Sequence, residues 1–211
     1  MLMENVPMKQ QVMSKIFLIL CVLFGASAAQ AEGDAQQIVQ TTTAEVMARV
    51  RAEKDTLRAQ PAKMYSLVSE MIFPHFDFAI MSQFVLGATW KTTPPEKQAA
   101  FVEQFRRLLV RTYATALLEY SDQRVEYPPS PAANNPKTAT VRQDIVQTVG
   151  KVLPIVYRLH NKTGEWKVFD VEVDGISLVK TFKSSFAQIL TDGGIDKLLE
   201  NLTSKNKDLG A

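Results

Sequence analysis

The stretch EWKVFDVEVDGISLVKTFKSSFAQILTDGGIDKLLENL, residues 165–202, changes its apolar period once, and that change indicates the fold class. From Trp166 to Val173 apolar and charged residues alternate, which is typical of a β-strand with one buried face. Asp174-Gly175 interrupts the alternation, and over 178–190 the apolar residues recur at helical spacing. Gly193-Gly194 predicts the end of that helix, because glycine adopts positive φ angles without steric cost. The stretch therefore predicts a strand that leads into one helix and then a second, short helix.

Upstream of this stretch the sequence predicts helices first and strands afterwards. Asp77 stands where it would cap a helix that Gly87 ends. Thr93-Pro94-Pro95-Glu96 has the pattern of a capping box with proline in the first turn, which predicts the start of a long helix. The expected helices cover residues 34–58, 62–72, 78–86 and, approximately, 95–120.

The central part of the chain has an apolar period of two, as strands do. Gly150-Lys151 and residues 161–164 are candidates for tight hairpin turns, which join antiparallel strands. The expected strands cover 125–127, 138–148, 152–160 and 165–174. The chain is therefore expected to be an α+β protein with one antiparallel sheet of about four strands, covered on one face by helices from both ends of the sequence.

The N-terminus has the features of a cleaved signal peptide. Lys9 and Lys15 precede an apolar run at 16–24, which is too short to span a bilayer, and Ala29-Gln30-Ala31 ends in the small residues that a signal peptidase accepts. We expect cleavage after Ala31, leaving residues 32–211 as one exported domain; a retained N-terminal anchor is the less favoured alternative. Cleavage would remove residues 1–31 with the one cysteine, so the mature chain would form no disulfide.

Composition excludes several classes of protein. The expected cleavage takes two of the 24 basic and one of the 22 acidic residues, which leaves a net charge of about +1 and no electrostatic case for binding nucleic acid. With 46% hydrophobic residues the chain is not a disordered one.

Candidate catalytic residues are few. The two histidines, His75 and His160, fit no nucleophile or metal motif; His75-x-Asp77 is better explained by helix capping, and His160 is expected to be solvated beside a turn. An esterase or lipid hydrolase would need a nucleophile, and the candidate serines have no histidine or acid placed near them by sequence; they are Ser177, Ser184 and Ser185. We expect no catalytic residues, no cofactor and no enzymatic activity.

Acidic residues along the last strand could suggest a cation site. Asp170, Glu172 and Asp174 alternate on one side of it, but three carboxylates in this arrangement more often form the solvated face of a strand. We therefore expect no metal site.

Large apolar and aromatic side chains are in excess on the elements expected to face the sheet. Aromatic residues at helical spacing usually fill a core, so an ordinary filled core is one interpretation. An apolar cavity that holds a hydrophobic ligand is the other, and composition does not separate the two.

Several segments resemble those of one family, and together they cover nearly all of the mature chain. They are PHFDF (74–78), VLGxxW (85–90), FxxLLVRTY (105–113), WKVxDV (166–171), GISL (175–178) and SF (185–186). The chain resembles the periplasmic phospholipid-binding components of the Mla (maintenance of lipid asymmetry) pathway, also called the toluene-tolerance auxiliary protein family.

This resemblance implies a fold, a ligand and partners. It implies a deep apolar pocket between a curved antiparallel sheet and surrounding helices, which holds phospholipid acyl chains. It also implies a periplasmic carrier that exchanges lipid with an inner-membrane ABC transporter complex, including its membrane-anchored lipid-binding subunit, and with an outer-membrane lipoprotein–porin complex. Such a carrier would maintain the lipid asymmetry of the outer membrane. Transport direction and head-group preference are not determined by any residue.

Apolar residues on expected inward faces are the candidates for contact with lipid tails. They are Phe84, Phe105, Leu109, Tyr113, Val156, Phe169, Val171, Phe182 and Phe186. Arg106, Arg107 and Arg111 could meet a phosphate or a partner at the rim, although solvated helix charges explain them more simply. A non-catalytic interaction module with a filled core is the alternative function.

Overall fold

The structure, a computed structural model, describes residues 33–131, 135–148 and 150–207. The expected signal peptide and its cleavage site lie outside these residues. A helix over 33–52 comes first. The elements that follow are α2 (Lys54–Ala59), α3 (Pro61–Met71), the 3-10 helix η1 (Phe73–His75), α4 (Phe78–Leu86), α5 (Ala88–Thr92), α6 (Pro95–Tyr120), β1 (Arg124–Glu126), β2 (Thr138–Val146), β3 (Val152–His160), β4 (Lys167–Val173), β5 (Ile176–Ser177) and α7 (Leu178–Asn206).

The strands form one antiparallel sheet in the order β1-β2-β3-β4-β5, so each strand pairs with its neighbour in the sequence. The α+β prediction is confirmed, with one strand more than expected. That strand, β5, exists because Asp174 and Gly175 both have positive φ angles, 50° and 79°, and so form a tight hairpin turn.

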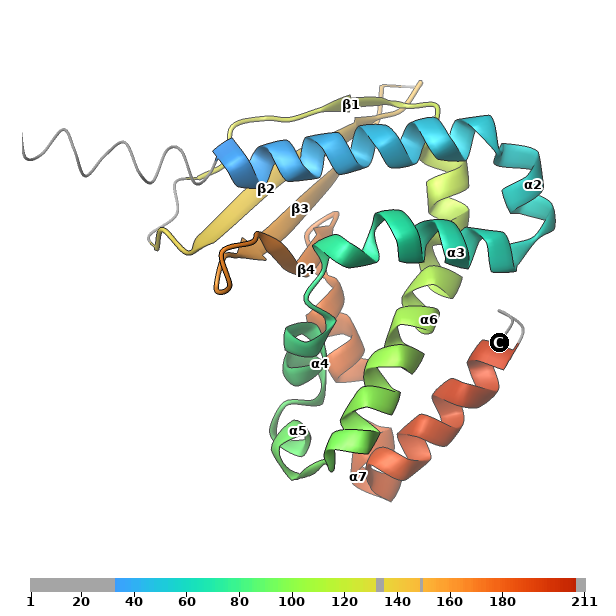
Figure 1. The fold of residues 1–211 in the computed structure, drawn as a ribbon, viewed down its shortest axis with the longest axis vertical. Coiled ribbons are helices and arrows are strands. Elements are labelled where there is room, and N and C mark those ends of the chain that lie inside the picture. Colours follow the sequence, from blue (N-terminus) through green and yellow to red (C-terminus); the bar gives the residue numbers. More distant parts are fainter. Residues whose placement is uncertain (1–32, 132–134, 149, 208–211) are drawn as a thin grey trace, which may run out of the picture.

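The helices surround one face of the sheet and extend beyond its edge. Figure 1 shows helix 33–52 lying across the strands, while α6 runs away from the sheet and α7 lies beside α6. Ala35 and Val39 of helix 33–52 pack against Ala139 and Val141 of β2, so this helix covers the inner face of the sheet. A second apolar cluster joins α4, α6 and α7, and a third joins helix 33–52 to α2, α3 and α6.

Local signals in the sequence set several element ends. Asp77 caps α4 as expected, its Oδ1 accepting a hydrogen bond of 2.9 Å from the Ile80 N–H. Gly87 ends α4 with a φ of 56°. Gly194, with a φ of 64°, breaks α7 into two helical halves at the position where the sequence predicts a helix stop.

Two helix predictions are wrong in detail. The expected helix over 34–58 is interrupted at Glu53, which adopts a turn, and α2 follows as a separate short helix. The expected capping box does not form, because the Thr93 hydroxyl donates to the Thr89 carbonyl oxygen at 2.7 Å instead of capping α6. The preceding helix α5 thus takes the hydroxyl that the motif assigns to α6.

Candidate functional site

A cavity of about 290 Å³ lies between helix 33–52, the inner face of the sheet, α3 and α6. Its wall takes residues from all three apolar clusters, for example Met81, Val171 and Val110. These clusters meet around the cavity without filling it, although protein interiors are normally close-packed. The cavity is therefore a property of how the three clusters are arranged, and it is the candidate functional site.

Each wall presents side chains at the period of its element. Helix 33–52 contributes Val39, Val46 and Val50 among others, at spacings of seven and four residues. On α6 the wall residues Leu109 and Tyr113 are four residues apart. Along β2 and β3 the wall residues alternate, as Gln143 and Ile145 do on β2 and Ile155 and Tyr157 on β3. On β4 the wall residues Val168, Val171 and Val173 are irregularly spaced.

The wall carries few ionisable groups. His75 is one of them, and burial lowers its pKa; nearby Lys167 lowers the pKa further, whereas Glu45 acts in the opposite direction. Burial also raises the pKa values of Tyr113 and Tyr157. The wall is therefore essentially uncharged at neutral pH, which suits apolar chains and does not suit an ion.

A small group of neutral polar side chains interrupts this apolar wall. Gln143 is only 2% exposed, and its Oε1 accepts a hydrogen bond of 3.1 Å from the Thr43 hydroxyl. Thr43 and Gln143 lie near the Tyr157 hydroxyl and oppose the rise in its pKa that burial causes, and Thr43 acts in the same way on the pKa of Tyr127. We call Thr43, Gln143 and Tyr157, all on the cavity wall, the inner polar cluster. It joins the middle of helix 33–52 to β2 and β3.

Three of the nine predicted tail-contact residues lie on the cavity wall: Leu109, Tyr113 and Val171. Three others, Phe105, Phe182 and Phe186, pack together in the cluster of α4, α6 and α7. Their rings contact one another edge-on or tilted, with centroids 5.2 and 5.7 Å apart for Phe182 against Phe105 and Phe186 respectively. These three therefore fill a core beside the cavity.

The remaining three are not on an inward face, so that part of the prediction is wrong. Phe84 is 51% exposed, and the centroid of its ring lies 6.0 Å from that of the Phe169 ring. Val156 alternates with Tyr157, whose side chain is inward, and so points to the outer face. Phe169 is displaced by a β-bulge: Val168 pairs with Leu159 and Asp170 with Arg158, leaving Phe169 unpaired between them. Simple alternation would have placed Phe169 with Val171.

The inner polar cluster was missed by sequence reasoning, although one signal was present. Gln143 falls on the inward register of β2, between Val141 and Ile145. A polar residue at a position that alternation assigns to the core is a recognisable exception. Thr43 and Tyr157 carry no comparable signal, because a threonine or a tyrosine on an amphipathic element is common.

His160 is not solvated as expected. It is 4% exposed, and its Nε2 lies 2.9 Å from Oδ2 of Asp77, the residue that caps α4. The Asp77 N–H also donates to the Val168 carbonyl oxygen at 2.8 Å. Asp77 therefore ties the start of α4 to β3 and β4, which agrees with a structural role for this pair.

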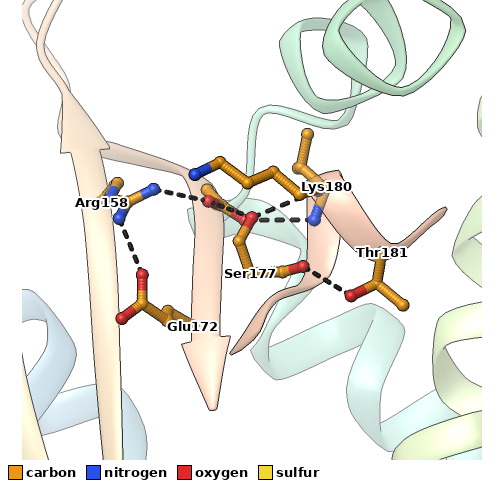
Figure 2. Close-up of polar contacts among 7 residues, drawn as sticks. Arg158, Glu172, Ser177, Lys180 and Thr181 are labelled. Carbon is orange, nitrogen blue, oxygen red and sulfur yellow. Dashed lines mark hydrogen bonds and ion pairs between the residues drawn. The ribbon is translucent and has the colours of Figure 1, made fainter. Parts of the chain in front are cut away.

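The acidic side of β4 is only partly solvated. Asp170 is 5% exposed, and its carboxylate accepts from Arg158 at 3.0 Å, from the Ser177 hydroxyl at 2.7 Å and from the Val179 N–H at 3.2 Å. Figure 2 shows Arg158 facing Glu172, an ion pair of 2.8 Å, and Ser177 beside the start of α7. The expectation of a solvated face is thus wrong for Asp170.

These contacts also bear on the esterase and metal readings. The buried Ser177 hydroxyl donates to Asp170 and caps α7 by accepting from the Lys180 N–H at 3.2 Å, which is a structural use of a serine. Within 33–131, 135–148 and 150–207, no group of three or more histidine, cysteine, aspartate or glutamate residues could hold a metal ion.

The three arginines of α6 differ in their surroundings. The Arg106 guanidinium lies over the rings of Phe73 and Phe78, 5.5 and 4.8 Å from their centroids, in cation–π contact. Arg107 pairs with Glu103 at 3.0 Å, and Arg111 donates to the Lys205 carbonyl oxygen. Contacts with a phosphate or a partner stay a prediction for all three.

No helix in the described part of the chain is both long enough and apolar enough to cross a membrane.

Comparison with known proteins identifies similar sequences and a similar fold. The family model of the MlaC protein matches residues 40–204. Toluene tolerance protein ttg2D of Pseudomonas putida is 32% identical over 160 residues, 75% of this chain and 74% of that protein. The intermembrane phospholipid transport system binding protein MlaC of Haemophilus influenzae is 27% identical over 188 residues, 87% of each chain.

A solved structure is similar over most of the fold. It is the phospholipid-binding protein from Ralstonia solanacearum in complex with a phospholipid, with a TM-score of 0.77 and 32% identity, covering 83% of this chain and 98% of that chain. The family model spans more than half of the sequence, and the folds agree. The chain therefore belongs to the MlaC family.

Proposed function

We propose that this protein is a periplasmic phospholipid carrier that shuttles lipid between an inner-membrane ABC transporter complex, with its membrane-anchored lipid-binding subunit, and an outer-membrane lipoprotein–porin complex. One observation carries the proposal, the apolar cavity of about 290 Å³ enclosed by helix 33–52, the sheet, α3 and α6. A relative of similar fold was solved in complex with a phospholipid, which supports the same ligand class here.

The energetics of lipid transfer favour such a carrier. Transfer of each methylene from water to an apolar environment is favourable by about 0.8 kcal/mol, so two acyl chains would cost more than ~20 kcal/mol to leave in water. A lipid that crosses an aqueous compartment therefore needs a protein that covers its chains. Covering them requires no acid, base or metal, so the proposed role is non-enzymatic.

The proposed tail contacts start from the predicted residues on the wall, Leu109, Tyr113 and Val171, and extend to their apolar neighbours there. For the other six predicted residues, packing in a neighbouring core or on the outer face explains their apolar character. The alternative function, an interaction module with a filled core, is disfavoured by the cavity.

Native mass spectrometry of the detergent-free protein, exported to a bacterial periplasm, tests the proposal. We expect bound masses that lipid extraction identifies as phospholipid. Leu109→Trp should lower the bound fraction, because it places an indole in the cavity, whereas Thr112→Trp, an exposed position on the same helix, should not. Lipid-free protein that also refuses phospholipid from vesicles would favour the interaction module.

Exchange with the two membrane complexes is tested separately. Purified protein loaded with a labelled phospholipid should deliver it to each complex reconstituted in its own vesicles, faster than to vesicles without protein. Equal rates with and without the complexes would contradict the shuttle, while leaving phospholipid binding intact.

A further inference from the structure

The inner polar cluster is unusual because it lies on a wall that is otherwise suited to hydrocarbon. Gln143 occupies an inward position of β2 between two apolar inward residues, Val141 and Ile145. Burying an amide costs free energy unless its hydrogen-bonding groups find partners. An apolar side chain would fill this position at no such cost, so the glutamine needs an explanation beyond packing.

The hydrogen bonds of the cluster use the acceptor of Gln143 more fully than its donors. Its Oε1 accepts from Thr43, and its amide carries two N–H groups, of which Tyr157 can accept one. The described residues supply no further hydrogen bond to this amide. Gln143 lies on the wall of an otherwise apolar cavity, so the complement of its remaining donor is an acceptor on a bound ligand.

The charge of the wall indicates which kind of acceptor fits. Neither lysine nor arginine lines the cavity within the described residues. A phosphate or a free carboxylate buried here would lack a cation, which is strongly unfavourable. An ester carbonyl is neutral, accepts hydrogen bonds and joins directly to the acyl chains of a phospholipid.

We propose that Gln143, supported by Thr43 and Tyr157, forms a hydrogen-bonding subsite for an ester carbonyl of the bound lipid. The inference rests on the proposed function. Thr43 holds the Gln143 oxygen and thereby turns the amide N–H groups toward the ligand. Carbonyl recognition at this point would fix how far the lipid enters the cavity, with the chains lying along the apolar walls of α3 and α6.

Competition between two matched lipids tests this subsite. The full chain is expressed, and the protein is purified in the form that the cell processes it to and then freed of lipid. It is mixed with equal amounts of a diacyl (diester) and a dialkyl (diether) phosphatidylethanolamine of equal chain length. Native mass spectrometry then gives the ratio of the two complexes. One hydrogen bond predicts a preference of roughly two- to tenfold for the diester.

Variants separate recognition from packing. Gln143→Leu should bring the ratio close to one, and Tyr157→Phe should reduce it. Val141→Ala, at a buried inward position of β2 that does not line the cavity, should keep the wild-type ratio. Tyr157→Phe provides the test if Gln143→Leu does not fold. A wild-type ratio near one, or a ratio unchanged in Gln143→Leu, would overturn the subsite alone. Failure to bind either lipid would overturn both the subsite and the proposed function.

Discussion

The buried carboxylate of Asp170 should be a principal link between the sheet and α7, and Asp170→Ala is the substitution that tests it. The side chain accepts hydrogen bonds from the Ser177 hydroxyl at 2.7 Å and from the Val179 N–H at 3.2 Å, both in buried surroundings, and pairs with Arg158 at 3.0 Å. Alanine removes the acceptor for all three donors at once.

The size of the stability loss in Asp170→Ala follows from how exposed each donor is. Leaving a buried donor without an acceptor costs about 1–3 kcal/mol, so the Ser177 hydroxyl and the Val179 N–H together account for about 2–6 kcal/mol. Arg158 adds little, because its side chain is 36% exposed and keeps its pair with Glu172. We therefore expect Asp170→Ala to lower the free energy of unfolding by about 3 kcal/mol.

Urea unfolding followed by circular dichroism measures this loss. With an m value of about 2 kcal/mol/M, the midpoint should fall by about 1.5 M. Glu172→Ala is the matched control, since it removes one pair from the same arginine at a half-buried position, and it should cost less than about 1 kcal/mol. Equal losses in the two variants would refute the reasoning, because they would show that the contacts with Ser177 and Val179 contribute nothing.

Three further predictions concern a cap, a kink and a titratable group. Asp77→Ala should cost about 2 kcal/mol, since it removes both the α4 cap and the partner of His160, while Asp77→Asn, which keeps an acceptor for the cap, should cost less; equal losses in urea unfolding would contradict the capping role. Gly194→Ala should cost about 1 kcal/mol by the same assay because the φ angle of 64° disfavours a Cβ, and an unchanged midpoint would count against it. The pKa of His75 is lowered in the folded protein, so the unfolded chain binds more protons and stability falls as pH drops below about 6.5. His75→Gln should therefore lose less stability than the wild type between pH 7 and pH 5, and parallel pH profiles would disprove this assignment.

Much of the fold was predictable because its signals are local. Asp77 and Gly87 bound α4 through a cap and a positive φ angle that depend on neighbouring residues only. Strands joined by tight turns in sequence order leave an antiparallel meander as the simplest sheet, and the structure has that topology. The capping box at Thr93 failed because the preceding helix competes for the same hydroxyl.

The candidate site was predictable only in part, since it depends on contacts between distant segments. Phe169 should face inward with Val171 by alternation, but the bulge opposite Arg158 and Leu159 turns it outward. Phe182 has the spacing of a cavity residue and yet fills a core, because α4, α6 and α7 close around it.

Local signals in the sequence were enough to predict the order of the main helices and strands, the cap at Asp77, the break at Gly194 and the family to which the chain belongs. These features rest on backbone preferences and on the periodic placement of apolar residues. Two features depend on tertiary packing: which apolar residues surround empty space, and the contact between Gln143 and Thr43, which are 100 positions apart in the chain. A cavity is what remains between packed elements, so no local pattern encodes it.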